Sequence, residues 1–258
     1  MSAVPLDVPL PPLATYALRL GDDALILAQR MGEWIASAPQ IEEDVALGNI
    51  ALDLLGQART LLTYAGEVEG AGRSEDDLAY LREERAFLNL HIVEQPGGDF
   101  GVTMARLLFF STYQLGLYDR LQHSSDPTLA GVAGKAVKEV AYHRDHATQW
   151  VLRLGDGTQE SHRRMQAGLA AMAPFVDEMF TGDGLEQSLS SAGVAVDVPT
   201  LREEWDRYVG SVLREATLEP PETTWTARGG RRGIHSEHFG HLLAQLQHLH
   251  RSHPGASW

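Results

Sequence analysis

Glutamate and histidine side chains that could bind iron come together in the segment KEVAYHRDH (residues 138–146). Glu139 precedes His143 by four residues and His146 by seven, which places all three on one face of a helix. Carboxylates and imidazoles that project from helices into a bundle core are the ligands of di-iron sites. The segment therefore raises the hypothesis of an oxygen-activating di-iron centre.

The rest of the sequence does not supply the other ligands of such a centre. A di-iron bundle takes one Glu from each of two helices and a Glu-x-x-His pair from each of the other two. No histidine occurs before His91, residues 102–118 contain no carboxylate, and Tyr142 stands where Glu139 would need its histidine. His143 comes one position late.

The sequence instead predicts a degenerate site in the bundle core, with no catalytic residue and no metal bound by this chain. Its members would be the polar residues that face the core from the second and fourth long helices, namely Asn49, Asp53, Glu139 and His143. His143 lies on an apolar seam, and we expect Glu139 or Asp53 to hydrogen-bond with it. The alternative is an autonomous ferritin-like di-iron oxygenase or iron-binding protein with an atypical site.

The elements that must position these residues are helices. Apolar residues recur at alternating steps of three and four along four long segments, which begin at Leu13, Ile41, Val102 and Pro127. The second segment carries only Asp53 and Arg59 as charged residues between 45 and 65, so we expect other protein to surround it. Shorter helices are predicted over 76–91, 161–180, 185–191, 200–218 and 236–250.

Four long helices with a long crossover between the second and third predict an all-α, ferritin-like four-helix bundle with additional C-terminal helices. We expect one domain over residues 13–258, because neither a repeat nor a second composition regime interrupts the chain. The proline-rich residues 1–12 are expected to form a disordered leader.

Composition narrows the classes of function. The 258 residues carry a net charge of −14, which disfavours nucleic acid and anionic membrane surfaces as partners. No cysteine is present, which excludes disulfides, thiolate nucleophiles and iron–sulfur ligation. With no signal-peptide pattern and no apolar run long enough to span a membrane, we expect a cytoplasmic protein.

Two C-terminal motifs remain. The loop ARGGRRG and the histidine that follows it suggest contact with an anion or with a protein partner, through Arg228, Arg231, Arg232 and His235. The alternative is a solvent-exposed or interface loop. His235, His238 and His241, spaced by three, could form a surface metal site, or they could lie on a solvated helix face.

Several long blocks of the sequence resemble one known family. These blocks are TYALRLGDDALILAQRMGEW, LGNIALDLLGQARTLLTYA, ERAFLNLHIVEQPGGDF, KAVKEVAYH, WVLRLGDGTQES and GGRRGIHSEHFG. They closely resemble the C-subunit family of bacterial ring-1,2-phenylacetyl-CoA epoxidases, and the resemblance runs from about Thr15 to Trp258.

The resemblance implies a role in a multicomponent, NADPH-dependent monooxygenase that epoxidises the aromatic ring of phenylacetyl-CoA. In that family a homologous A subunit holds the di-iron centre and the substrate. The C subunit has a similar fold, lacks the ligand set and pairs with A as a structural partner. The resemblance therefore implies a heteromer with the A subunit, within which the arginine loop could meet the phosphates of coenzyme A in trans.

Overall fold

The computed structural model of the chain describes residues 10–256, and its regular elements are helices, with no β-strand in that range. The long helices are α1 (Pro12–Gly32), α2 (Ile41–Glu69), α5 (Phe100–Leu121) and α6 (Pro127–Gly155). α1 packs mainly on α2 and α5 on α6, and contacts between α2 and α6 join the two pairs. This arrangement confirms the ferritin-like bundle predicted from the sequence.

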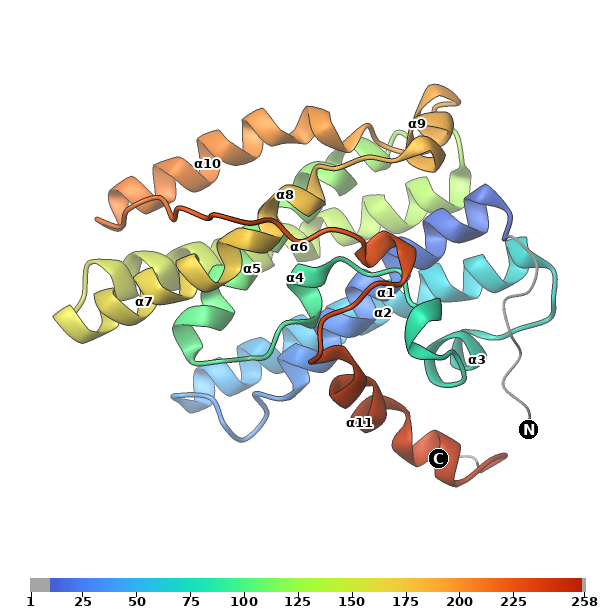
Figure 1. The fold of residues 1–258 in the computed structure, drawn as a ribbon, viewed down its shortest axis with the longest axis horizontal. Helices are drawn as coiled ribbons and strands as arrows, with labels where there is room; N and C mark the ends of the chain where they lie inside the picture. Colours follow the sequence, from blue (N-terminus) through green and yellow to red (C-terminus); the bar gives the residue numbers. More distant parts are fainter. Residues whose placement is uncertain (1–9, 257–258) are drawn as a thin grey trace.

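The remaining helices surround the bundle (Figure 1). They are α3 (Glu75–Tyr80), α4 (His91–Glu94), α7 (Gln159–Met172), α8 (Val176–Met179), α9 (Gly184–Ser191), α10 (Arg202–Glu215) and α11 (Phe239–Ser252). α7 and α10 pack on the α5–α6 pair, whereas α11 lies against α3. None of the described helices combines the length and apolarity needed to cross a bilayer.

Local signals fix the ends of the long helices. Asp99 caps α5 by accepting from the backbone N–H of Val102, and Asp126 caps α6 in the same way ahead of Pro127. α2 ends at Glu69 and is capped by Gly70, whose φ of +72° is the left-handed conformation common after a helix. α1 begins at Pro12 and Leu10 packs against the core, so the end of the disordered leader expected over 1–12 is in fact ordered; residues 1–9 lie outside the described residues.

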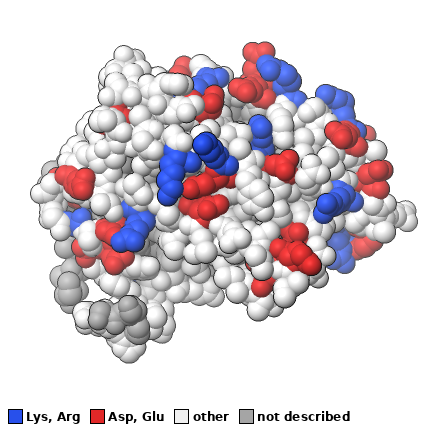
Figure 2. Space-filling view, turned by 180° about the vertical axis from the view of Figure 1, so that it is seen from behind, with Lys and Arg blue, Asp and Glu red and all other residues white. Residues whose placement is uncertain are grey.

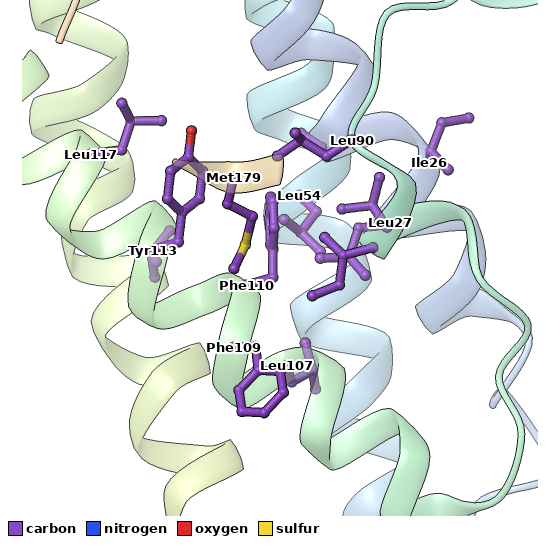
Figure 3. Close-up of a cluster of buried hydrophobic side chains, with 14 of the residues drawn as sticks. Ile26, Leu27, Leu54, Leu90, Leu107, Phe109, Phe110, Tyr113, Leu117 and Met179 are labelled. Atoms are coloured by element: carbon purple, nitrogen blue, oxygen red, sulfur yellow. The ribbon is translucent and has the colours of Figure 1, made fainter. Parts of the chain in front are cut away.

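The core is one continuous apolar cluster that extends from the bundle into the surrounding helices. Figure 3 shows part of this cluster, in which Leu27 of α1, Leu54 of α2 and Phe110 of α5 converge with Met179 of α8. All four side chains are almost completely buried. Because the C-terminal helices contribute to this cluster, residues beyond the four-helix bundle are part of the same folding unit.

Two predicted helices differ in the structure. The helix expected over 161–180 is interrupted by a 3₁₀ turn at Ala173–Phe175, where Pro174 lacks the N–H that would continue it. The helix expected over 76–91 is only α3 and a 3₁₀ turn (Glu84–Ala86), followed by extended backbone. In that extended stretch, Asp22 and Asp23 of α1 accept hydrogen bonds from the backbone N–H groups of Leu88 and Leu90.

Candidate functional site

The core between α2, α5 and α6 contains a sparse polar layer. Nε2 of His143 lies 3.1 Å from Oδ2 of Asp53, and Nε2 of Gln57 donates to Oε2 of Glu139 over 3.0 Å. Gln114 of α5 donates to the amide oxygen of Gln57 over 3.2 Å. The layer therefore joins three bundle helices through one imidazole–carboxylate pair and a chain of amides.

His143 sits in surroundings that favour its neutral form. Its side chain is 2% exposed, and burial lowers the pKa of His143 although the nearby charges of Asp53 and Glu139 oppose this shift. Asp53 is about one-third exposed and partly hydrated. A neutral imidazole beside a solvated carboxylate is a satisfied structural pair and needs no further ligand.

A second imidazole–carboxylate pair lies nearer the end of the bundle. Nε2 of His146 is 3.1 Å from Oε2 of Glu43, and both side chains are about 9% exposed. Burial lowers the pKa of His146, against the attraction of Glu43. The two pairs remain separate, and residues 10–256 contain no group of three or more His, Asp or Glu side chains arranged to hold a metal ion.

The donor set of this layer does not fit the di-iron centre typical of the fold. Two positions in the layer carry the neutral amides of Gln57 and Gln114, and the nearby carboxylates of Asp53 and Glu139 each already accept from another side chain. A di-iron centre needs four carboxylates to balance its two cations. The layer can hold the helices in register, and a recess of about 280 Å³ between α2 and α6 reaches it beside Glu139.

The structure places the four predicted members of the layer differently. It brings Asp53 and His143 together and puts Glu139 nearby, where Glu139 bonds to Gln57 rather than to His143. The core position expected for Asn49 is wrong, because Asn49 is exposed and lines a groove on the outer side of α2. Asn49 precedes Asp53 by four residues, which offsets it by about 40° around the helix axis, and this offset carries Asn49 from the side of α2 that faces α6 to the exposed side.

In the C-terminal loop, the structure differs more strongly from the sequence-based expectation. Arg231 points inward and donates to the carbonyl oxygens of Arg19 and Leu88, both at 3.0 Å, and to Oδ2 of Asp23 at 2.7 Å. Burial alone would lower the pKa of Arg231, but the attraction of Asp23 outweighs it and raises that pKa. Arg231 is therefore already fully engaged, and the anion contact expected of it is wrong.

His235 is likewise already engaged by partners within the protein. Its side chain is 0% exposed, with Nδ1 2.8 Å from Oε2 of Glu94 and Nε2 3.0 Å from the carbonyl oxygen of Phe87. The contact with an external anion or partner expected of His235 is therefore wrong as well. Arg228 and Arg232 are exposed.

The glycines of the loop explain why Arg231 faces inward and Arg232 faces outward. A Cβ on Gly230 would collide with the carbonyl oxygen of Asn89, and one on Gly233 would collide with that of Arg85. Gly233 also has a φ of +70°. The motif GGRRG thus presses backbone against the crossover between α2 and α5, which turns Arg231 inward and Arg232 outward.

A dense buried network, which the sequence prediction missed, surrounds this contact. Asp22 pairs with Arg82 in a bidentate ion pair, and Glu178 accepts from the backbone N–H groups of His91 and Gly230 and from the His91 ring. Glu94 accepts from Asn89, Ser236 and His235. The adjacent acids Asp22 and Asp23, within an otherwise apolar stretch of α1, are the sequence signal that could have revealed the network.

Charges on the surface follow no single sign. Figure 2 shows that, on the face turned away from the view of Figure 1, lysines and arginines are interspersed with aspartates and glutamates. This face therefore offers no continuous basic stripe of the kind that tracks a nucleic-acid backbone.

Two comparisons with known proteins, one with a protein family and one with a single relative, agree with each other. Residues 4–258 match the family described as "Phenylacetic acid catabolic protein". The chain is also 46% identical over 246 residues to the C subunit of 1,2-phenylacetyl-CoA epoxidase from Escherichia coli (strain K12), an alignment that covers 95% of this chain and 99% of the relative. With a helical bundle of the expected type and a match over nearly its whole length, the chain belongs to the phenylacetic acid catabolic protein family.

Proposed function

We propose that this chain is a non-catalytic structural subunit of a 1,2-phenylacetyl-CoA epoxidase complex in aerobic phenylacetate catabolism. It pairs in the cytoplasm with the homologous catalytic A subunit, which it stabilises and which holds the di-iron centre. The similarity to the C subunit of the Escherichia coli enzyme supports the assignment to such a complex.

The observation that carries the non-catalytic role is the polar layer between α2, α5 and α6. Gln57 and Gln114 place neutral amides there, and Glu139 is already engaged by Gln57. These amides are neutral and can lie buried without a cation, whereas a cluster of four carboxylates in a bundle core requires metal to balance its charge.

Iron content and complex formation test the two halves of the proposal. Purified alone from iron-rich medium, the chain should contain no stoichiometric iron and show no absorption from an oxo-bridged di-iron centre. Two irons per chain would instead support the alternative, an autonomous ferritin-like di-iron oxygenase or iron-binding protein. Co-expression with the A subunit should give a complex that survives gel filtration, and separate elution at micromolar concentration would contradict the pairing.

A finer part of the proposal concerns coenzyme A. Arg228 and Arg232 are the arginines of the C-terminal loop that remain exposed, and a guanidinium can hold a phosphate through paired hydrogen bonds. Replacing both with Ala in the assembled complex should raise KM for phenylacetyl-CoA and leave kcat unchanged, since a remote phosphate contact contributes uniform binding. An unchanged KM would remove coenzyme A from the partners of this loop.

A further inference from the structure

The α2 helix has a second apolar seam that faces outward. Its buried seam includes Leu47, Leu54 and Leu61, all 0% exposed. On the outer side, apolar or small residues recur at alternating steps of four and three, at Ile41, Val45, Gly48, Leu52 and Leu55. The four large side chains of this outer seam are 45–75% exposed, although the spacing is that of a helix-packing surface.

The outer seam borders a groove of about 520 Å³. One wall comes from Leu25 and Ala28 of α1 and from Ile35 in the turn that follows it, and the end is closed by Tyr80 of α3 and Leu246 of α11. Gly32 and Gly48 lie in the groove, and a Cβ on either would meet nothing within 4 Å. The glycines therefore leave room for another backbone to approach α1 and α2 closely.

The dimensions suit a helix. From Ile41 to Leu55 the seam is about 21 Å long at 1.5 Å per residue, which is about four helical turns. A helix with apolar residues at steps of three and four can place them between those of the seam, as in coiled coils. A small ligand would use only part of so long and open a surface.

Charge selects among the helices that could bind. Between residues 41 and 58 the chain contains no lysine or arginine, whereas Glu42 and Asp44 flank the seam. A second copy of this chain, whose net charge is −14, would place like charges against these acids. A helix flanked by lysine or arginine would instead gain attraction along the same edge.

We propose that the groove between α1 and α2 is the docking site for an amphipathic helix of a partner subunit, with an apolar stripe at three- and four-residue spacing and basic residues beside it. This inference rests on the proposed function, because it names the surface through which the chain joins its complex. The docking site also explains why α2 is apolar on both sides although the rest of the chain covers only one of them.

The sharpest test fills the groove without disturbing the fold. Gly48→Leu puts a large side chain where the structure has open space, and it should leave the unfolding midpoint equal or higher because Leu favours a helix more than Gly does. The matched control is Gly134→Leu, at an exposed position of α6 with equally open space. Binding of each full-length variant to the purified A subunit is measured by calorimetry.

Gly48→Leu should weaken this binding at least tenfold, with Gly134→Leu within twofold of wild type. The double variant Leu52→Ser/Leu55→Ser should also weaken it, whereas Leu249→Ser, which removes a comparably exposed leucine from α11, should not. Glu42→Lys should weaken binding more at low salt than at high salt.

The outcomes separate the two proposals. Failure of wild type to bind the A subunit would overturn the proposed function, whereas wild-type binding that Gly48→Leu leaves intact would overturn only the groove assignment. Loss of binding through Gly134→Leu alone would move the interface to α6. Self-association of wild type that Gly48→Leu abolishes would assign the groove to a second copy, and stronger binding after deletion of residues 1–9 would assign it to the chain's own N-terminus.

Discussion

The two polar regions inside this protein differ in charge and in position. The layer between α2, α5 and α6 is sparse, built on amides and partly hydrated at Asp53. The network between α1, the crossover and the C-terminal loop is dense and ionic, with Asp22 and Glu94 both 0% exposed. The densest group of buried charges therefore lies where α1 meets the crossover and the C-terminal loop, and it holds these peripheral segments in place.

The strongest test of this comparison removes one partner of a buried ion pair. Asp22→Ala removes the carboxylate that pairs with the buried guanidinium of Arg82 and accepts from the N–H of Leu88. The free energy of unfolding should fall by about 3–5 kcal/mol in urea titrations. The control Arg59→Ala, which breaks an exposed pair with Glu75, should change it by less than about 1 kcal/mol. Equal losses of unfolding free energy in the two variants would contradict a stabilising role of the network.

A backbone variant tests the same network at the loop. Gly233→Ala would force a Cβ against the Arg85 carbonyl oxygen and strain a φ of +70°. We expect destabilisation by about 2–4 kcal/mol, measured by urea unfolding. Gly134→Ala, in an open helical position of α6, should instead stabilise by up to about 1 kcal/mol. A neutral Gly233→Ala variant would show that the loop is not pressed against the crossover.

The pH dependence of stability tests the pair of His91 and Glu178. Burial opposes both charges, but the hydrogen bond between the two side chains wins: it raises the pKa of His91 above 6.5 and lowers the pKa of Glu178 below 4.5. The contribution of His91 is complete below pH 6.5 and is lost as pH rises through its raised pKa. That of Glu178 is complete above pH 4.5 and is lost as pH falls through its lowered pKa.

The stability advantage of wild type over His91→Gln should therefore be largest between pH 4.5 and 6.5. We expect about 1–3 kcal/mol there and a smaller difference at about pH 8.5, from chemical unfolding at each pH. A difference that stays constant from about pH 6 to about pH 8.5 would show that His91 is not charged in the folded protein.

The smallest effect is expected in the amide layer. Glu139→Ala removes the acceptor of Gln57 and should destabilise by about 1 kcal/mol, whereas Glu139→Gln, which keeps an acceptor, should be nearly neutral. In an assembled epoxidase complex, both variants should retain turnover. If Glu139→Ala lost turnover without losing stability, the layer would take part in chemistry and the comparison between the two regions would fail.

The sequence was sufficient for the parts of the fold that rest on local periodicity. The four long helices and their crossover follow from apolar spacing and from caps such as Asp126. For His143 the sequence left Glu139 and Asp53 as possible partners, and the structure pairs it with Asp53. The segment 81–91 was misassigned because its charged run LREER is typical of an exposed helix. Arg82 is in fact buried, and Asp22 and Asp23 supply the backbone partners that a helix would otherwise provide.

The inward turn of Arg231 could not be predicted for a related reason. Its partners Arg19 and Asp23 lie more than 200 residues earlier in the chain. Only the tight backbone contacts at Gly230 and Gly233 decide which arginine of the loop faces inward. A local sequence pattern contains no information about contacts between residues so far apart in the chain. By its composition alone, the whole ARGGRRG segment is typical of a solvent-exposed loop.

The pairing of Arg231 with Asp23 also sets an order of events during biosynthesis. The two residues are 208 positions apart, so at about 5–20 residues per second the ribosome adds Arg231 roughly 10–40 s after Asp23. Throughout that interval the nascent chain contains α1 with an acid whose cation does not yet exist. Glu94 and Glu178 likewise wait for the backbone donors of Ser236 and Gly230. A chain terminated before residue 229 would lack Arg231, Gly230 and Ser236 at once, so these buried contacts of Asp23, Glu178 and Glu94 can form only after the C-terminal loop has been synthesised.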